Sequence, residues 1–326
     1  MFPWSCRRCV ALPVGVGVLL WTAAASGAGV EVSPKADRVT VSVDGELVTE
    51  LRFADGPKPY WYPLLAPGGV AVTRHYPMRR DVADEEKDHP HHRSLWFSHG
   101  DVNGADFWAE GEGRGRIVQE RILEAQGGAE SGVVRTANRW ETAQGEVLLT
   151  DETAMRVHRR AGERVLDYRI TLKAGAKAGV FGDTKEGTMA VRLAESMRLK
   201  PNAHHAKDPV GTILQSTGIR DGATWGKRAA WTAYSGPVEG KPMTVAIFDH
   251  PANPRYPTWW HVRDYGLFAA NPFGVHDFER KPAGTGNLEL KAGESVTFRY
   301  RFLIRPGAAE SAALEKLGAE FARSEP

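Results

Sequence analysis

The segment that decides the fold is residues 116–173, RIVQERILEAQGGAESGVVRTANRWETAQGEVLLTDETAMRVHRRAGERVLDYRITLK. It contains four strand-like runs separated by short turns rich in Gly and polar residues, such as Gln126-Gly127-Gly128 and Ala143-Gln144-Gly145. Runs of this kind bounded by such turns are typical of antiparallel strands that follow one another in space. We therefore predict a meander of long strands at residues 116–124, 132–141, 146–158 and 164–173.

The strand pattern extends to both sides of this segment. Residues 39–43 alternate with period two, Asp44-Gly45 is a hairpin turn, and residues 46–53 return as the partner strand. Only residues 308–322 have helical periodicity, which indicates one short C-terminal helix. Further strands are expected at residues 70–73, 188–196, 212–216, 228–235, 243–249, 259–262, 266–270, 288–291 and 295–306.

These elements predict an all-β fold, a large antiparallel two-sheet super-sandwich with a short C-terminal helix. No linker, low-complexity tract or internal repeat interrupts residues 29–326, so we expect a single domain there. An immunoglobulin sandwich needs only about 100 residues, and two-layer or closed architectures protect the edges of so many strands. A super-sandwich of the type found in sugar mutarotases fits best. A β-propeller is the alternative, but no blade-length repeat supports it.

Residues 1–28 have the pattern of a secretory signal peptide. Arg7 and Arg8 form a basic region, residues 9–25 are an apolar run, and small residues follow. An uncleaved membrane anchor is the alternative, but the run is short for a span of about 20 residues. We therefore expect a cleaved signal peptide and a periplasmic or secreted protein.

Cleavage would remove both cysteines, Cys6 and Cys9, so the mature chain would hold no disulfide and no cysteine-based redox or zinc site. The loss of Arg7 and Arg8 would also lower the Lys and Arg count from 42 to 40, which equals the 40 Asp and Glu residues. A neutral chain lacks the basic excess that sequence-independent nucleic-acid binding requires. We expect no nucleic-acid partner and no membrane span after the signal, and the oligomeric state stays open.

Residues 88–108, DHPHHRSLWFSHGDVNGADFW, hold four of the eleven histidines beside three aspartates and two tryptophans. Polar groups that leave water must be paired or cost free energy, so this density of them is typical of a functional cleft. Three further polar patches lie at the expected ends of strands, where β scaffolds carry binding and catalytic groups. They are GDTKEG at 182–187, DHPANPR at 249–255 and WWHVRDYG at 259–266 with NPFG at 271–274.

These strings, together with GGVAVTRHYP at 68–77 and GDTKEGTMAVR at 182–192, resemble a family of exported bacterial proteins known as methane oxygenase PmoA (PmoA-like) over most of the mature chain. The resemblance implies a β-rich, galactose-mutarotase-like fold and a context of carbohydrate metabolism, without an established reaction. A membrane subunit of a methane monooxygenase would need several apolar spans, and this sequence has none after its signal.

Metal binding is one chemistry that these residues could support. His89 and His91, or His99 and Asp101, are two residues apart and would point the same way on an extended chain. Pro90 disturbs that geometry, and no fixed ligand spacing such as HExxH occurs. Histidine clusters serve proton transfer equally well. We predict no cofactor and no metal site, with a divalent metal as the alternative.

Carbohydrate binding is the second chemistry. Sugars present flat C–H faces and many hydroxyls, so their sites combine aromatic rings with polar side chains. Most tryptophans pack inside sheets, but several here stand beside charged residues. The predicted substrate-binding residues are His91, Arg93, Trp96, Asn103, Asp106, Trp108, Lys185, Arg192, His250, Asn253, Arg263 and Asn271.

Acid/base catalysis is the third. It would need a carboxylate and a histidine on opposite sides of a reacting sugar, one to remove a proton and one to donate it. The predicted catalytic residues are His92, His99, Asp101, Glu186 and His261. Glu186 or Asp101 would be the base, and His92 or His261 the acid. Lys185-Glu186 could equally be a solvated ion pair, and Arg192 part of a structural one.

Three functional hypotheses follow. The first is an exported carbohydrate-processing enzyme that acts on a sugar or glycoside as an epimerase, lyase or hydrolase, with a small-molecule or oligosaccharide substrate. The second is a non-catalytic carbohydrate-binding protein on the same fold. The third is the metal-dependent oxidoreductase that the family label suggests. The first requires the four polar segments to converge in one cleft.

Overall fold

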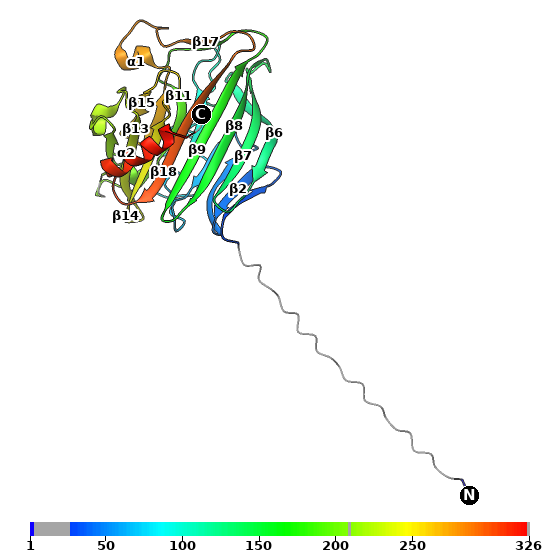
Figure 1. Cartoon of the computed structure of the whole chain (residues 1–326). Helices are drawn as coiled ribbons and strands as arrows, with labels where there is room; N and C mark the ends of the chain where they lie inside the picture. The colour runs from blue at the N-terminus through cyan, green and yellow to red at the C-terminus, as the bar shows by residue number, and fades with distance from the viewer. Residues whose placement is uncertain (3–26, 208–209, 325–326) are drawn as a thin grey trace.

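Two eight-stranded antiparallel sheets form the body of the molecule, which confirms the predicted all-β super-sandwich (Figure 1). The computed structural model describes residues 1–2, 27–207 and 210–324. The predicted signal peptide, residues 1–28, lies almost entirely outside the described residues. Within the described part of the chain, no helix has the length and apolar character needed to cross a membrane.

The first sheet joins strands from the two halves of the chain. Strand β5 pairs with β11, and this pairing brings the histidine-rich stretch beside the 182–192 segment. From edge to edge the sheet contains β1 (Val30–Pro34), β2 (Arg38–Val43), β3 (Glu46–Arg52), β4 (Tyr60–Leu64), β5 (Leu95–His99), β11 (Gly187–Arg192), β16 (Leu267–Asn271) and β15 (Trp259–Val262).

The second sheet contains the predicted meander as its strands β6 to β9, which lie side by side in Figure 1. From edge to edge it contains β12 (Thr212–Gln215), β13 (Trp231–Val238), β14 (Lys241–Asp249), β18 (Ser295–Pro306), β9 (Glu163–Ala174), β8 (Val147–Arg160), β7 (Ser131–Glu141) and β6 (Arg116–Gln126). A separate pair consists of β10 (Gly179–Phe181) and β17 (Leu288–Leu290).

Helices are short and few in the described residues. The predicted C-terminal helix is α2 (Ser311–Ala322). A one-turn helix, α1 (Val275–Glu279), was not expected, because one turn is too short to show helical periodicity. Two 3₁₀ turns are η1 (Glu195–Met197) and η2 (Asp221–Thr224).

The β2–β3 hairpin shows how turn chemistry sets strand pairing. Asp44 and Gly45 have positive φ angles of 52° and 81°. Positive φ at both central residues is what a type I′ turn requires, and its twist matches that of the flanking strands. The turn brings Val43 opposite Glu46, as the Asp-Gly pair predicts.

An apolar core fills the space between the sheets. The burial of β8 and β9 alternates along much of each strand, as expected for strands with one face in the core. On β18, Phe298, Tyr300 and Phe302 point into the same core. The period of two thus decides which residues the second sheet buries.

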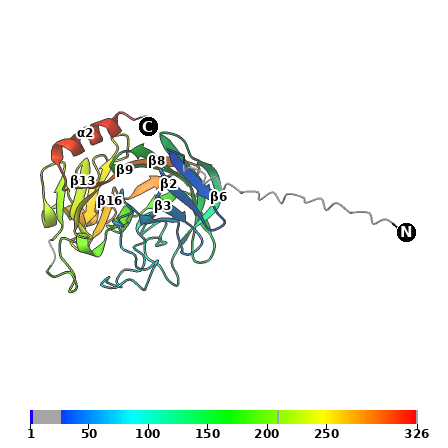
Figure 2. The same ribbon diagram turned by 90° about the horizontal axis from the view of Figure 1, so that it is seen from below.

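The central strands of the first sheet are buried on both faces. Every residue of β5, β11 and β16 is buried, because loops cover the outer face of this sheet. Figure 2 shows those loops on the side of the sandwich opposite α2. The covered face is where the polar segments meet.

Helix α2 covers part of the outer face of the second sheet (Figures 1 and 2). Its Leu314 and Phe321 are buried in a cluster with Trp231 and Phe248, and Leu317 packs against the same cluster. The helix therefore buries the apolar face that its sequence periodicity predicts.

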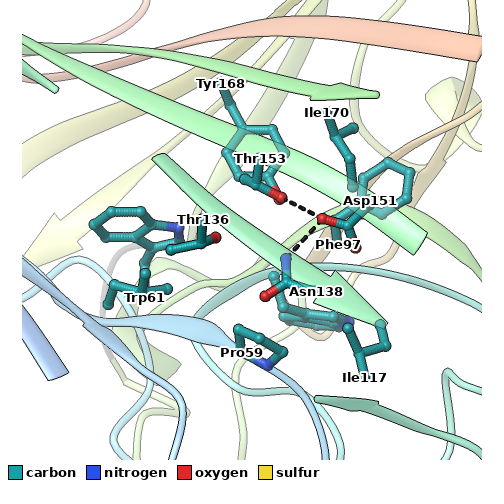
Figure 3. A pocket seen from close by; sticks show the side chains of 12 residues that line it. Pro59, Trp61, Phe97, Ile117, Thr136, Asn138, Asp151, Thr153, Tyr168 and Ile170 are labelled. Atoms are coloured by element: carbon teal, nitrogen blue, oxygen red, sulfur yellow. Dashed lines mark hydrogen bonds between the residues drawn. The ribbon is translucent and has the colours of Figure 1, made fainter. Parts of the chain in front are cut away.

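A polar cluster lies inside the sandwich, around a small cavity of about 20 Å³ (Figure 3). Asp151 accepts hydrogen bonds there from Asn138 Nδ2 (2.6 Å), Thr153 Oγ1 (2.9 Å) and Trp140 Nε1 (2.7 Å). Burial raises the pKa of Asp151, and the three donors oppose that rise. The cavity has room for about one water molecule among these polar groups.

Replacing Asp151 is expected to destabilise the fold. Asp151→Ala would leave three buried donors without an acceptor, and the free energy of unfolding should fall by about 3 kcal/mol or more. Asp151→Asn keeps the shape and one acceptor oxygen, so its loss should be roughly half as large. Urea unfolding at pH 7 measures both, and a loss below about 1 kcal/mol for the alanine variant would contradict a role in stability.

Candidate functional site

One row of residues across the outer face of the first sheet forms the base of the candidate site. Trp96 of β5 is paired with Ala190 of β11, which is paired with Ala269 of β16. Ala269 is in turn paired with His261 of β15. Neighbouring strands are about 4.8 Å apart, so the row spans roughly 14 Å. The two alanines leave space above the middle of the sheet.

A layer of rings from the covering loops fills this space. Trp108 tilts against Trp96 with ring centroids 5.1 Å apart, and the His92 ring stacks on Trp96 at 5.4 Å. The rings of His89, His92 and Tyr265 are nearly parallel, and His89 lies 4.8 Å from His92 and 5.2 Å from Tyr265. The rings form an aromatic floor on a small-residue patch of the sheet.

A cleft of about 280 Å³ opens above the floor. It is lined by His89, His91, His92, Asp106, Trp108, Ala109, Lys185, Glu186, His261, Arg263 and Tyr265. Three of the four polar segments therefore converge, those at 88–108, 182–187 and 259–266. The fourth, at 249–255, contributes no residue to this cleft.

Buried ion pairs hold the histidine-rich turn against the sheet. Arg74 and Arg192 are fully buried, and both donate to the carboxylate of Asp88, Arg192 from 3.1 Å. Glu195 lies 3.4 Å from Arg192, and Arg74 also donates to the backbone carbonyls of Asp88 (2.9 Å) and His89 (3.1 Å). Paired carboxylates and carbonyls offset the cost of taking two guanidinium groups out of water.

Arg192 sets the tautomer of His92. Its Nη1 lies 3.2 Å from His92 Nδ1, and a guanidinium can only donate, so Nδ1 accepts and Nε2 carries the proton of the neutral ring. Burial, and next the charge of Arg192, holds the pKa of His92 well below its usual range. His92 is therefore a neutral side chain at neutral pH, with Nε2–H as its donor.

His261 has the opposite tautomer. Its Nδ1 lies 2.7 Å from the carbonyl oxygen of Lys185 and donates to it, which leaves Nε2 as an acceptor. Burial lowers the pKa of His261 to about 4, against the effect of that hydrogen bond. The rings of Trp225 and Phe278 pack around it at 6.4 Å and 6.3 Å.

His91 is the third neutral histidine of the cleft. Burial, and next the charge of Lys58, lowers the pKa of His91 to about 4. Lys58 is itself buried, donates to the carbonyl of Trp108 at 2.8 Å and pairs with Glu110 at 3.0 Å. Burial lowers the pKa of Lys58 to about 8, and Glu110 opposes this shift.

The charged side chains of the cleft are balanced. Lys185 Nζ lies 3.5 Å from Glu186 Oε1, and each of these side chains is 39% exposed. Arg263 lies over the ring of Tyr265, 5.6 Å from its centroid. Asp106 pairs with Arg114 outside the lining set, at 2.8 Å. The lining thus contains two cations, Lys185 and Arg263, and two carboxylates, Glu186 and Asp106, of which Asp106 is paired with Arg114.

Several predicted binding residues support the cleft from beneath. Asn271 Nδ2 donates to the carbonyls of Thr184 (3.0 Å) and Lys185 (2.9 Å), and so positions the loop that carries Glu186. Trp96 and Arg192 lie under the floor. Within the described residues, the buried Nε1 atom of Trp96 has no hydrogen-bond partner. These three side chains are positioning residues rather than lining residues.

His99 lies in the core and not in the cleft. Alternation along β5 places residues 97 and 99 on the inner face. His99 Nε2 donates to the carbonyl of Gly182 at 2.8 Å, and its ring packs 4.6 Å from that of Phe273. Burial lowers the pKa of His99 to about 4. His99 was predicted to be catalytic, but its side chain is buried in the core and does not line the cleft.

Asp101 and Asn103 hold the loop after β5 and do not reach the cleft. Asp101 Oδ1 accepts from the backbone nitrogen of Gly104 at 2.8 Å. Asn103 accepts from the backbone nitrogen of Val180 (2.7 Å) and donates to the carbonyl of Ala178 (3.0 Å). Both side chains satisfy backbone groups of turns, a common use of Asp and Asn.

Three other predicted binding residues also form their contacts outside the cleft. Arg93 forms two 2.8 Å bonds to Glu110. His250 packs against Phe321 of α2 with centroids 4.9 Å apart, and Asn253 donates to Asp249 at 2.7 Å. His250 and Asn253 follow β14, a strand of the second sheet, so they lie away from the loops that build the cleft.

Two residues of the site, Tyr265 and Arg74, are not among the predicted site residues. Tyr265 stands two residues after Arg263 in the quoted WWHVRDYG string. The polar residues beside it were therefore the feature that could have marked it as a site residue. Arg74 follows the apolar run GGVAVT, where a charge needs a buried partner. Within the described ranges, no group of three or more His, Cys, Asp or Glu side chains is placed to hold a metal ion.

The fold and the cleft define a β super-sandwich protein with one histidine-rich cleft on its first sheet. The chain belongs to the family of unknown function DUF6807, which matches residues 38–319. Comparison of the sequence with curated proteins finds no match.

Solved structures similar to the chain include sugar epimerases. A galactose mutarotase related enzyme from Lactobacillus acidophilus is 11% identical, with 86% of this chain and 97% of that chain covered and a TM-score of 0.32. Galactose 1-epimerase from Lactobacillus acidophilus NCFM is 8% identical over 86% and 98%, with a TM-score of 0.39. A Glycoside Hydrolase Family 97 enzyme from Pseudoalteromonas sp. strain K8, in complex with acarbose, is 12% identical over 86% and 35%, with a TM-score of 0.33.

The lowered pKa values predict a loss of stability in acid. The unfolded chain protonates its histidines below about pH 6.5, whereas the folded protein keeps His91, His99 and His261 neutral down to about pH 4. Stability is therefore fully present above about pH 6.5 and falls as the pH drops from there toward 4, by roughly 1–2 kcal/mol per buried histidine at pH 5. Urea unfolding at pH 7.5 and pH 5 measures the loss.

His99→Gln is the informative variant, because it removes one buried histidine and leaves the cleft residues in place. The difference in unfolding free energy between pH 7.5 and pH 5 should shrink in this variant. An equal difference in the wild-type protein and in His99→Gln would show that His99 is not held neutral in the folded protein.

Proposed function

We propose that the protein is a carbohydrate-processing enzyme that removes a proton from a neutral sugar or glycoside, as epimerases and lyases do. The observation that carries the proposal is that one half-exposed carboxylate, Glu186, shares a cleft with three neutral histidines above a floor of aromatic rings.

The balanced charge of the cleft favours a neutral ligand. Neutral imidazoles donate one hydrogen bond and accept another, so they suit hydroxyl groups, which also do both. His92 offers a donor at Nε2 and His261 an acceptor at Nε2. Of the two lining cations, Lys185 is already beside Glu186 at 3.5 Å, and Arg263 lies over the ring of Tyr265.

The aromatic floor favours a ligand with apolar faces. Trp108 and Tyr265 line the cleft with ring surfaces, and ring surfaces pack against the C–H faces of sugars. A volume of about 280 Å³ accommodates one or two sugar rings. A monosaccharide or the end of a glycoside is the ligand class that this combination supports.

Glu186 is the proposed base. Its carboxylate would take the proton of a carbon next to a carbonyl group, as in a keto-sugar or an open-chain aldose. The electron pair of the broken C–H bond would then move onto the carbonyl oxygen, held by the Nε2–H of His92. A neutral histidine can stabilise such an oxygen as a hydrogen-bond donor without giving up its proton. Hydrolysis would instead need a group that protonates a leaving oxygen, and the low pKa values of the three histidines make them neutral.

A non-catalytic sugar-binding protein is the second candidate. The same low pKa values make His91 and His261 weak proton acceptors, which suits binding as well as catalysis. Two further proposals rest on sequence patterns alone. One is export to the periplasm or beyond, from the apolar run at 9–25, and the other is membership of the PmoA-like group, from the quoted strings.

Glu186→Gln is expected to abolish proton removal. In deuterated water, wild-type protein should exchange a carbon-bound hydrogen of its substrate within a panel of aldoses, keto-sugars and glycosides, measured by NMR. Loss of the base should slow that exchange by roughly 10²–10⁴-fold. The melting temperature should stay near that of wild type, because the Glu186 side chain is half-exposed and Lys185 is its one ion-pair partner among the described residues.

Glu112→Gln is the matched control, since Glu112 is an exposed glutamate outside the cleft and should leave the exchange unchanged. Binding of panel members without exchange in the wild-type protein would favour the sugar-binding candidate. Equal exchange rates in the wild-type protein and Glu186→Gln would remove Glu186 as the base.

A further inference from the structure

A second groove lies on the outer face of the second sheet. This face of the sheet is turned toward the viewer in Figure 1. This groove has a volume of about 920 Å³. Its floor is formed by strands β6, β7, β8, β9 and β18, and Phe321 of α2 and Ser324 just after it line the groove as well. None of its lining residues belongs to the histidine-rich cleft. The groove is therefore a separate candidate site.

Arginine dominates the charge of the groove. The five arginines that line it are Arg135, Arg156, Arg169, Arg299 and Arg301. The three lining carboxylates are Glu124, Glu152 and Asp167. Cations thus outnumber carboxylates even with the lining His158 counted as neutral. An excess of arginine on a concave surface raises the local concentration of anions.

Within the described residues, the lining carboxylates form ion pairs with two of the five lining arginines, Arg301 and Arg135. Asp167 accepts two hydrogen bonds from Arg301, at 2.6 Å and 2.8 Å, and a third contact joins it to His158 Nε2 at 2.7 Å. Glu124 and Glu152 lie 3.5 Å and 3.4 Å from Arg135. No lining carboxylate forms an ion pair with the other three arginines within the described residues.

Two of those three arginines stand directly opposite each other. Arg169 of β9 and Arg299 of β18 are partners in the strand register, so both side chains leave the same face of the sheet. Within the described residues neither guanidinium has an ion-pair partner, and the buried Nε of Arg299 has no hydrogen-bond acceptor. Burial, and next the charge of Arg169, lowers the pKa of Arg299.

Arg156 extends the unpaired group to the next strand. It is exposed on β8, and the hydrogen bond that its side chain makes is to the hydroxyl of Ser131 at 3.1 Å, which leaves its charge without a carboxylate. The strand register places Arg156 opposite Asp167, two residues before Arg169 on β9. The three guanidinium groups are therefore spread over three neighbouring strands.

Like charges placed opposite each other in a sheet destabilise it, so this arrangement costs stability that a bound anion would restore. Guanidinium groups bind carboxylate, sulfate and phosphate oxygens through paired hydrogen bonds. We propose that the groove over β8, β9 and β18 binds a ligand that carries several oxyanion groups on an extended chain, through Arg156, Arg169 and Arg299. An acidic oligosaccharide, with carboxylate or sulfate groups, has that chemistry and the length to cross three strands.

The proposal is independent of the chemistry at the cleft, because the two sites differ in both residues and charge. Binding is tested by calorimetry in low salt with four probes: a galacturonic acid tetramer, a sulfated tetrasaccharide, inorganic sulfate, and a neutral maltotetraose. Wild-type protein should bind at least one charged tetramer, and added salt should weaken that binding. Any heat from maltotetraose should be the same in wild type and in the Arg169→Gln/Arg299→Gln variant, because a neutral chain does not need the groove arginines. The tetramer that binds identifies the oxyanion as carboxylate or sulfate, and competition by inorganic sulfate would show that single oxyanion groups are recognised.

The double variant Arg169→Gln/Arg299→Gln should bind the charged tetramer at least tenfold more weakly. Arg305→Gln is the matched control, since Arg305 lies on β18 but outside the groove, and it should bind as wild type does. The double variant without ligand should melt about 1–3 °C higher than wild type, because a like-charge pair is removed. A lower melting temperature would mean that the arginines support the fold instead. Equal binding by the double variant, or no binding of either charged tetramer to wild type, would overturn the proposal.

Discussion

The burial of two guanidinium groups, those of Arg74 and Arg192, is the constraint on which the cleft depends. Neither has any exposed surface, and each must keep hydrogen-bonded partners to remain charged away from water. Asp88 and Glu195 supply those partners, and Asp88 lies at the start of the histidine-rich turn. The ion pairs therefore fix the position of the turn over β11. Because Arg192 also donates to His92, the same interaction that holds the turn determines which nitrogen of that histidine carries a proton.

The two sheets of the sandwich expose different chemistry because different elements cover them. Loops from three parts of the chain cover the first sheet, and small residues at Ala190 and Ala269 let their rings pack close to its strands. The resulting cleft holds neutral histidines and balanced charges, which suits a neutral polyhydroxyl ligand. Helix α2 covers only part of the second sheet. The remainder keeps the alternating polar face of a half-buried sheet, and that face presents arginines to solvent.

Strands with one face in the core were the predictable part of the fold. In the meander, alternation and Gly-containing turns agree with the observed strands, and the Asp44-Gly45 turn takes the backbone that the residue pair favours. Strand β5 was harder to predict, because it is buried on both faces and so shows no alternation. It also lies inside the 88–108 stretch, whose polar residues suggested a site rather than a strand. Its period of two places Trp96 under the cleft and His99 in the core. Neighbours in the chain can thus have unrelated roles.

The sequence by itself determined the fold class and marked four polar segments, three of which meet, because alternation, turn residues and the local density of polar groups are properties of short stretches. Only the tertiary structure decided which side chains of those segments face the cleft. That choice depends on strand register and on which sheet each strand joins, and both are set by contacts between residues far apart in the chain. The 249–255 segment shows the difference. It has the composition of a site, but it follows a strand of the second sheet and supports the fold there instead.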